Sequence, residues 1–273
     1  MGLDIFSQYT NYSPVSVPEV GNVLMPVLTD YRFALLGVNK TATDVDAYLA
    51  AHKDKQEFLT KYGLTPKLRG GQVRSAITVL EHYARFSDDA SLVPVFGKEG
   101  SRYGEVICSM EVTDGQGHDF YYPITSVKVD TQTSYQVGRE LGVPKEVWSS
   151  IGLIVDNEGL QQSVDARAYK TSADKDSNNP VIDIHWNGYL SAPIRLPQAQ
   201  AFVNKDDEGN ERIAEYISDY DGVHMAFTRE TILPNTTVTI RDEEMNEFLG
   251  LTPNYSMIIY GGAQSVFGEH LNP

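Results

Sequence analysis

The chain has 273 residues, of which 41% are hydrophobic and 22% are charged, and this composition is typical of a globular protein. Its formal net charge of −15 repels phosphate backbones and anionic membranes, and its 22 lysines and arginines form no concentrated basic cluster along the sequence. We therefore expect neither a nucleic-acid-binding protein nor a membrane-associated one.

The single cysteine, Cys108, excludes an internal disulfide bond and fits a reducing cytoplasm. It lies in an apolar run, where a buried and inert thiol is expected rather than a nucleophile. The first ten residues lack the basic and apolar regions of a secretory signal peptide. These observations predict a cytoplasmic location.

The first third of the chain predicts an extended arm and a helix. Residues 1–30 are rich in Pro, Val and Tyr, and we expect an arm that ends in a strand. A helix is predicted over Thr43–Tyr62, because Thr43 can cap its first turn and Gly63 can end it.

Strand patterns dominate the rest, because β-branched and aromatic residues recur in short runs between turn residues. The strand candidates are Ala76–Phe86, Glu105–Val112, Phe120–Val129, Gly159–Ala168, Val181–Tyr189, Ala199–Val203, Arg212–Tyr220, Thr236–Arg241 and Met257–Tyr260. Short helices are predicted at Pro144–Ile151 and Asp242–Leu249. Many short strands favour a closed barrel or a sandwich, and the absence of repeats and linkers favours one domain over residues 1–273.

The segment from Asn204 to Glu215 resembles a calcium-binding loop in the spacing of its acidic residues, but we interpret it as a hairpin. Its flanks are predicted strands rather than helices, and the apolar position of such a loop holds Glu211. A hairpin that turns at 207–209 explains the same residues. The six histidines show no metal-ligand spacing, so the sequence predicts no metal and no other cofactor.

The segment with the most chemical content runs from Tyr135 to Glu146 and holds Lys145 just after a proline among apolar residues. A lysine forms imines only when it is neutral, and burial in apolar surroundings lowers its pKa by up to several units. Local composition alone favours a solvent-exposed lysine at the start of a helix.

A resemblance to a known family favours the buried lysine. The run Val137-Gly-Arg-Glu-Leu141 followed by Pro144-Lys145 resembles the signature of the acetoacetate decarboxylases, in which it leads to the lysine that forms a Schiff base. The resemblance implies a mainly β (α+β) fold with a closed barrel and short helical insertions, and an oligomeric assembly. It also implies that Glu105, in Tyr103-Gly-Glu105, acts as the acid or base.

The same resemblance suggests two further site residues. A first family glutamate falls near Glu81, which would orient or assist Glu105. A family arginine near the N-terminus corresponds to Arg32, which would hold a substrate carboxylate in a fork geometry.

The sequence departs from the family directly after the nucleophile, where the decarboxylases have a second lysine and this chain has Glu146. We expect Glu146 beside Lys145 in the substrate site, where an ionised carboxylate would favour the charged lysine. Three explanations stay open: Glu146 points away, Glu146 is protonated, or desolvation alone lowers the pKa of Lys145.

These residues predict a lyase that forms a Schiff base with a small keto acid. Glu146 slightly favours aldol condensation and dehydration of a pyruvate-like substrate over decarboxylation of a β-keto acid. A barrel that binds a small ligand without turnover is the third possibility.

Overall fold

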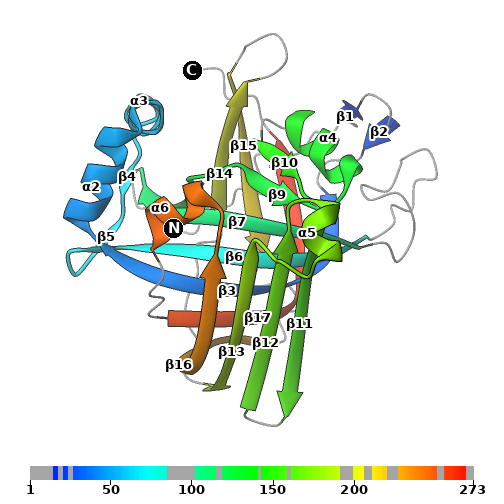
Figure 1. The fold of residues 1–273 in the computed structure, drawn as a ribbon. Helices are drawn as coiled ribbons and strands as arrows, with labels where there is room; N and C mark the ends of the chain where they lie inside the picture. Colours follow the sequence, from blue (N-terminus) through cyan, green and yellow to red (C-terminus); the bar gives the residue numbers. More distant parts are fainter. Residues whose placement is uncertain are drawn as a thin grey trace.

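The computed structural model describes residues 15–17, 21–23, 27–84, 102–114, 119–140, 143–158, 161–190, 199–205, 211–219, 227–250 and 255–268. These residues form mostly strands with a few helices (Figure 1), which confirms the predicted fold class of strands with short helical segments. Within this part of the chain, no helix is both long and apolar enough to cross a membrane.

Of the strands in the described part of the chain, fifteen belong to one hydrogen-bonded sheet. Seven of them pair in a cycle that returns to its start, in the order β7, β8, β14, β15, β17, β3, β6 and again β7. Their bounds are β3 Val27–Thr41, β6 Gln72–Ala84, β7 Arg102–Thr113, β8 Asp119–Pro123, β14 Ala199–Lys205, β15 Glu211–Asp219 and β17 Tyr255–Gly268.

The remaining strands of the sheet extend from this cycle. β16 (Phe227–Ile240), β13 (Ile182–Leu190), β12 (Gln161–Tyr169) and β11 (Ser150–Glu158) continue antiparallel from β17 and cross in front of β3 and β6 in Figure 1. On the other side, β9 (Val127–Val129) pairs with β7, and β10 (Lys145–Val147) pairs with β9 in parallel. The two-residue strands β4 (Thr65–Pro66) and β5 (Leu68–Arg69) pair with β7 and β6. β1 (Val15–Val17) and β2 (Gly21–Val23) form a separate pair.

The hydrophobic core lies between one face of β6 and β7 and the elements that cover it. Apolar side chains of α2 (Ala42–Ala51), α3 (Lys53–Lys61), α6 (Glu243–Leu249) and β11–β13 belong to this core. Cys108 lies in it fully buried, as predicted, and burial raises the pKa of its thiol well above the usual value. The side chains on the core side of β7 are therefore occupied by this packing.

Several predicted elements differ from the structure. The helix predicted over Thr43–Tyr62 is divided at His52 into α2 and α3, and its N-cap is Thr41, whose side chain accepts a hydrogen bond from the backbone N–H of Asp44. Gly63 follows the helix with a φ of +64°, as its predicted role requires. The strand predicted over Phe120–Val129 is interrupted between β8 and β9.

Two differences bear on the site. The helix predicted at Pro144–Ile151 is wrong, because Lys145–Val147 is the strand β10 and Ser150 begins β11. The helix α4 (Gln132–Glu140), which holds most of the signature run, was not predicted. By contrast, β14 and β15 pair antiparallel with Lys205 opposite Glu211, which confirms that the calcium-like segment is flanked by paired strands. The predicted turn at 207–209 lies outside the described residues.

Candidate active site

Lys145 lies at the start of β10, and its side chain is only 7% exposed. Two oxygens from different elements are close to its amine. Nζ lies 3.2 Å from Oγ of Ser134 on α4 and 3.7 Å from Oε2 of Glu105 on β7. A buried lysine between a hydroxyl and a carboxylate is an arrangement in which a nucleophilic amine can exchange protons.

Gly138 of the signature run allows α4 to lie directly against Lys145. A Cβ built on Gly138 would be 2.3 Å from Cδ and 2.5 Å from Cε of Lys145. The backbone N–H of Val143 donates to the carbonyl of Gly138 at 2.8 Å, which fixes the connection from α4 toward β10. The glycine of the run is thus explained by space: any side chain there would occupy the volume of the lysine stem.

Burial is the largest influence on the pKa of Lys145. Desolvation lowers the pKa of Lys145 from its usual value of 10.5, and Glu105 opposes this by favouring the charged form. The ring of Tyr103, whose centroid is 5.6 Å from Nζ, also interacts favourably with the ammonium. The net shift is downward, so more of the amine is neutral and nucleophilic at a given pH than in a solvated lysine.

The strand registers explain why Glu105 faces Lys145. Lys145 is paired with Val127 in the β10–β9 ladder, and Glu105 is paired with Val129 in the β9–β7 ladder. Directly paired residues share a face, and so do residues two apart along one strand. Lys145 and Glu105 therefore lie on the same face, and Glu105 is buried there with 6% of its surface exposed.

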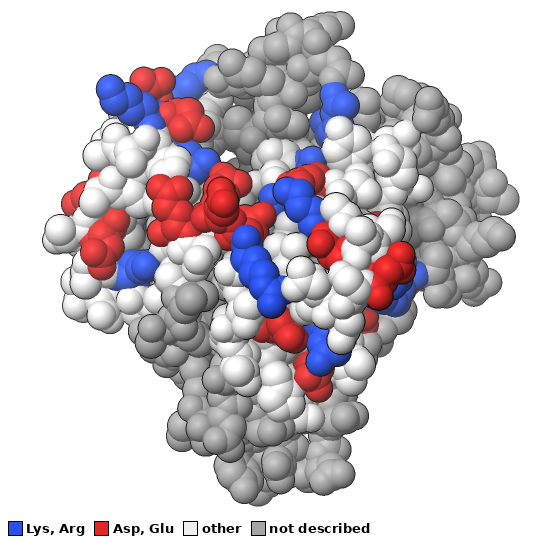
Figure 2. Space-filling view, in the orientation of Figure 1, with Lys and Arg blue, Asp and Glu red and all other residues white. Residues whose placement is uncertain are grey.

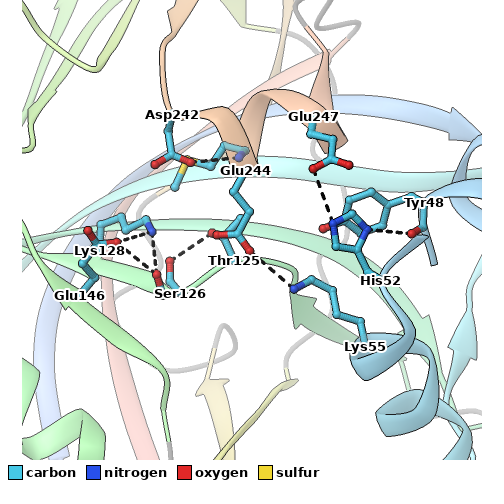
Figure 3. Close-up of polar contacts among 11 residues, drawn as sticks. Tyr48, His52, Lys55, Thr125, Ser126, Lys128, Glu146, Asp242, Glu244 and Glu247 are labelled. Atoms are coloured by element: carbon cyan, nitrogen blue, oxygen red, sulfur yellow. Dashed lines mark hydrogen bonds and ion pairs between the residues drawn. The ribbon is translucent and has the colours of Figure 1, made fainter. Parts of the chain in front are cut away.

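Glu146 lies on the opposite face, which corrects the prediction that it lines the substrate site. It is paired with Lys128, and its Oε2 is 2.7 Å from Nζ of that lysine. Lys170 approaches Oε1 at 3.2 Å. Figure 3 shows Glu146 beside Lys128 and Ser126. The physical reason is strand alternation: consecutive residues of β10 point to opposite sides.

The charge of Glu146 is compensated where it lies. Burial alone would raise the pKa of this carboxyl, but the hydrogen bonds and charges of Lys128 and Lys170 outweigh burial and hold the pKa below its usual value. Glu146 is therefore ionised and pairs with a lysine whose side chain is 2% exposed. Of the three open explanations, the structure supports two together: Glu146 points away, and desolvation alone lowers the pKa of Lys145.

Glu81 is not brought to Lys145 either. It is paired with Gly104, the neighbour of Glu105, so its side chain lies on the face opposite Glu105. There it is 3% exposed, accepts a hydrogen bond from the Arg102 guanidinium at 2.8 Å, and accepts another from the backbone N–H of Leu153 at 3.2 Å. These contacts join β6 to β11 and occupy Glu81 in the core.

Arg32 is paired with Glu81 in the β3–β6 ladder, and its side chain lies outside the described part of the structure. Its predicted role in holding a carboxylate therefore stays a prediction.

Two residues near the amine were not found from the sequence. Tyr103 lies two residues before Glu105 on β7 and was noted only as part of the motif. Ser134 lies eleven residues before Lys145, and nothing in the local pattern distinguishes it from other serines. The proximity of Ser134 to Lys145 becomes apparent only when α4 is known to pack against β10.

The surface around this fold carries mixed charge. In the view of Figure 2, lysines and arginines alternate with acidic residues over the described surface, and no purely basic region is seen on this face.

Comparison with solved structures identifies the fold. The enzyme MppR of enduracididine biosynthesis, in complex with pyruvate, aligns with a TM-score of 0.61 at 13% identity and covers 95% of this chain and 98% of its own. An acetoacetate decarboxylase-like enzyme from Sphingomonas wittichii RW1 aligns with a TM-score of 0.53 at 13% identity over 90% of this chain and 93% of its own. The chain has the acetoacetate decarboxylase-like fold.

A third structure is MppR in complex with the condensation product of pyruvate and imidazole 4-carboxaldehyde. It aligns with a TM-score of 0.61 at 13% identity and covers 96% of this chain and 98% of its own. No protein-family model and no curated protein matches the chain by sequence. In this acetoacetate decarboxylase-like fold, the signature run recognised in the sequence corresponds to α4 and the start of β10.

Proposed function

We propose that the protein is a Schiff-base-forming lyase in which Lys145 forms an imine with a small keto acid. We further propose that aldol condensation and dehydration of a pyruvate-like substrate follow. The observation that carries this proposal is the buried amine of Lys145 with the carboxylate of Glu105 at 3.7 Å. Burying a lysine is costly for a fold, and a buried lysine whose pKa is lowered beside an acid is typical of a functional site.

The first step uses the lowered pKa of Lys145. The lone pair of the neutral amine attacks the ketone carbon, and the carbonyl electron pair moves to oxygen. After a proton passes from nitrogen to that oxygen, the resulting hydroxyl is protonated and leaves as water. The product is a protonated imine, which withdraws electrons from the neighbouring carbon.

Glu105 is proposed as the acid and base of the following steps. As a carboxylate it removes a proton from the carbon next to the imine, which gives an enamine. The enamine attacks an aldehyde carbon, and the new alkoxide takes a proton. Loss of water then forms a carbon–carbon double bond, and hydrolysis of the imine releases an unsaturated keto acid and restores Lys145.

Two observations support condensation rather than another fate of the imine. Abstraction of a proton from carbon requires a base near the imine, and Glu105 occupies that place. A structure with the same fold, MppR, is described with pyruvate and with a pyruvate condensation product. The charge of Glu146 no longer contributes to the choice, because Glu146 lies on the other face of the sheet.

The strand pairings support a closed barrel around the amine. Because the cycle of paired strands returns from β6 to β7, we propose that it encloses the face that carries Lys145 and Glu105. Exclusion of water by such a wall keeps Lys145 desolvated. No role is proposed for Arg32, because it pairs with Glu81 and not with a residue of the face that carries Lys145 and Glu105. The oligomeric assembly and cytoplasmic location remain predictions from sequence.

Decarboxylation of an acetoacetate-type substrate is the alternative, and the fold shared with an acetoacetate decarboxylase-like enzyme favours it. It would use the same imine but lose carbon dioxide in place of a proton. A side-by-side assay separates the two reactions: carbon dioxide release from acetoacetate, and new ultraviolet absorbance from pyruvate with an aldehyde.

We expect condensation with pyruvate and little carbon dioxide release from acetoacetate. Lys145→Met, which keeps an unbranched apolar stem without the amine, should abolish the condensation. Rapid acetoacetate decarboxylation that depends on Lys145 would support the alternative, and turnover that survives in Lys145→Met would contradict both reactions.

A further inference from the structure

Ser134 lies in the first turn of α4 with only 1% of its surface exposed. Its hydroxyl oxygen is 3.2 Å from Nζ of Lys145, which makes it nearer to the amine than Glu105 at 3.7 Å. Its own backbone N–H donates to Oγ1 of Thr131 at 3.3 Å. The position of the hydroxyl is thus set by the helix start and by the packing of Gly138 against the lysine stem.

The Ser134 hydroxyl has a proton available. Serines inside helices often donate to the carbonyl four residues earlier, and this interaction occupies their hydrogen. Among the residues that the structure describes, the amine of Lys145 is the one hydrogen-bond partner of this hydroxyl. The oxygen can therefore accept a hydrogen from Nζ while its own hydrogen is directed to a substrate.

The two oxygens approach the amine from different elements, α4 and β7. A neutral amine has two N–H groups and one lone pair. One N–H group donates to Ser134 at 3.2 Å, the other can face the Glu105 carboxylate at 3.7 Å, and the lone pair is left to attack a ketone. The attack produces an ammonium next to an alkoxide, and the ammonium nitrogen must then lose a proton that the alkoxide gains.

We infer that Ser134 is a further catalytic residue, whose hydroxyl carries this proton from Nζ of Lys145 to the oxygen of the bound keto acid. In this step the Ser134 oxygen accepts a proton from the ammonium nitrogen and gives its own proton to the alkoxide. The N–H and O–H bonds exchange, the serine is unchanged at the end, and a neutral carbinolamine is formed. The inference rests on the proposed imine at Lys145.

This assignment leaves Glu105 for the other proton transfers. A protonated Glu105 can donate to the carbinolamine hydroxyl as it leaves, and the resulting carboxylate can then act on the neighbouring carbon. With separate groups for the two transfers, Glu105 does not have to be a base and an acid within one step.

The test measures the rate of imine formation in the full chain. Reactions with pyruvate are stopped with borohydride at successive times, and the reduced adduct on the Lys145 peptide is quantified by mass spectrometry. Ser134→Ala removes the hydroxyl, Ser134→Thr retains it, and Thr133→Ala is the matched control on the same helix. The rate is measured against pH for each variant.

We expect Ser134→Ala to slow imine formation about 100-fold, the lower range for loss of a general acid–base group. Ser134→Thr should recover most of the rate, and Thr133→Ala should match the unmodified protein. Among the residues that the structure describes, the titratable and polar groups that face Nζ are Glu105 and Tyr103 from β7 and Ser134 from α4.

The pH profile separates loss of the hydroxyl from loosened packing. Loss of an acceptor that favours the charged amine moves the acid limb of the rate to lower pH. Water that enters a loosened site moves the limb upward, toward the usual pKa of lysine. The role of Ser134 is overturned if Ser134→Ala moves the acid limb upward or leaves the rate unchanged. If the unmodified protein still traps substrate in that experiment, the imine at Lys145 stands. Failure of the unmodified protein to trap any keto acid overturns the imine and the role of Ser134 together.

Discussion

Gly138 offers the most direct structural perturbation of the nucleophile, because its Cα lies against the stem of Lys145. A Cβ at this position would be 2.3 Å from Cδ and 2.9 Å from Cγ of the lysine. Ordinary van der Waals contact begins at 3.4 Å, so Gly138→Ala requires the stem to move by about 1.1 Å, the difference between 3.4 and 2.3. The lysine is the flexible partner and is therefore the group that moves.

The size of the effect follows from that displacement. A misplacement of about 1 Å at a reacting group costs roughly 100-fold in rate, which is about 2.7 kcal/mol of barrier. Stability should change much less. Alanine in place of glycine inside a helix contributes about 0.5–1 kcal/mol, and this partly offsets the overpacking.

The assay is the rate of borohydride-trapped adduct on Lys145, measured together with the free energy of unfolding in urea. Gly152→Ala is the control, because the nearest atom to its added Cβ lies 4.0 Å away, at the carbonyl oxygen of Arg167. Gly152→Ala should trap substrate at the normal rate. A Gly138→Ala protein that is stable and traps at the normal rate would refute the packing argument.

Three further substitutions have distinct expected outcomes. Glu105→Gln should still trap substrate on Lys145 but lose about 100-fold in turnover. Because the Glu105 charge raises the pKa of Lys145, its loss should move the acid limb of the pH profile for the trapping rate to lower pH. Unchanged turnover would remove Glu105 from the mechanism. Glu146→Gln should reduce the free energy of unfolding in urea by about 1–3 kcal/mol, because it leaves the 2%-exposed Lys128 without its counter-charge. The pH profile of the trapping rate at Lys145 should stay unchanged, and a shifted profile would contradict the placement of Glu146 on the opposite face. Gly104→Ala would place a Cβ 2.6 Å from the Cβ of Ile151 in β11. It should therefore lower the midpoint of thermal unfolding by an amount corresponding to about 1–3 kcal/mol, and an unchanged midpoint would refute this contact.

The sequence selected two residues that the structure brings together, but it did not select their neighbours. The signature run and the Tyr-Gly-Glu motif led to Lys145 and Glu105, which the structure places 3.7 Å apart. Glu146 was placed in the site because it directly follows the nucleophile, where the decarboxylases have a second lysine, and because strand alternation was not expected in a segment predicted as a helix. In a helix, consecutive side chains are about 100° apart and can share a pocket, whereas in the strand β10 they point to opposite faces.

The face of the sheet on which Glu81 lies also depends on a one-residue difference in the pairing of β6 with β7. Placing it next to Glu105 required only that β6 and β7 be neighbours, which is correct. The side on which a strand residue lies depends on which residue it pairs with, and a low-similarity alignment leaves that uncertain by one position. Ser134 was missed because its contact with Lys145 depends on a helix that the sequence pattern did not predict.

The central claim is that Lys145 forms the imine, and one measurement tests it most directly. The protein is treated with borohydride in the presence of pyruvate and, separately, acetoacetate, and peptides are analysed for the mass of the reduced ligand. We expect the added mass on the peptide that holds Lys145 and none in Lys145→Met. A label on another lysine, or no label with any keto acid tested, would contradict the account.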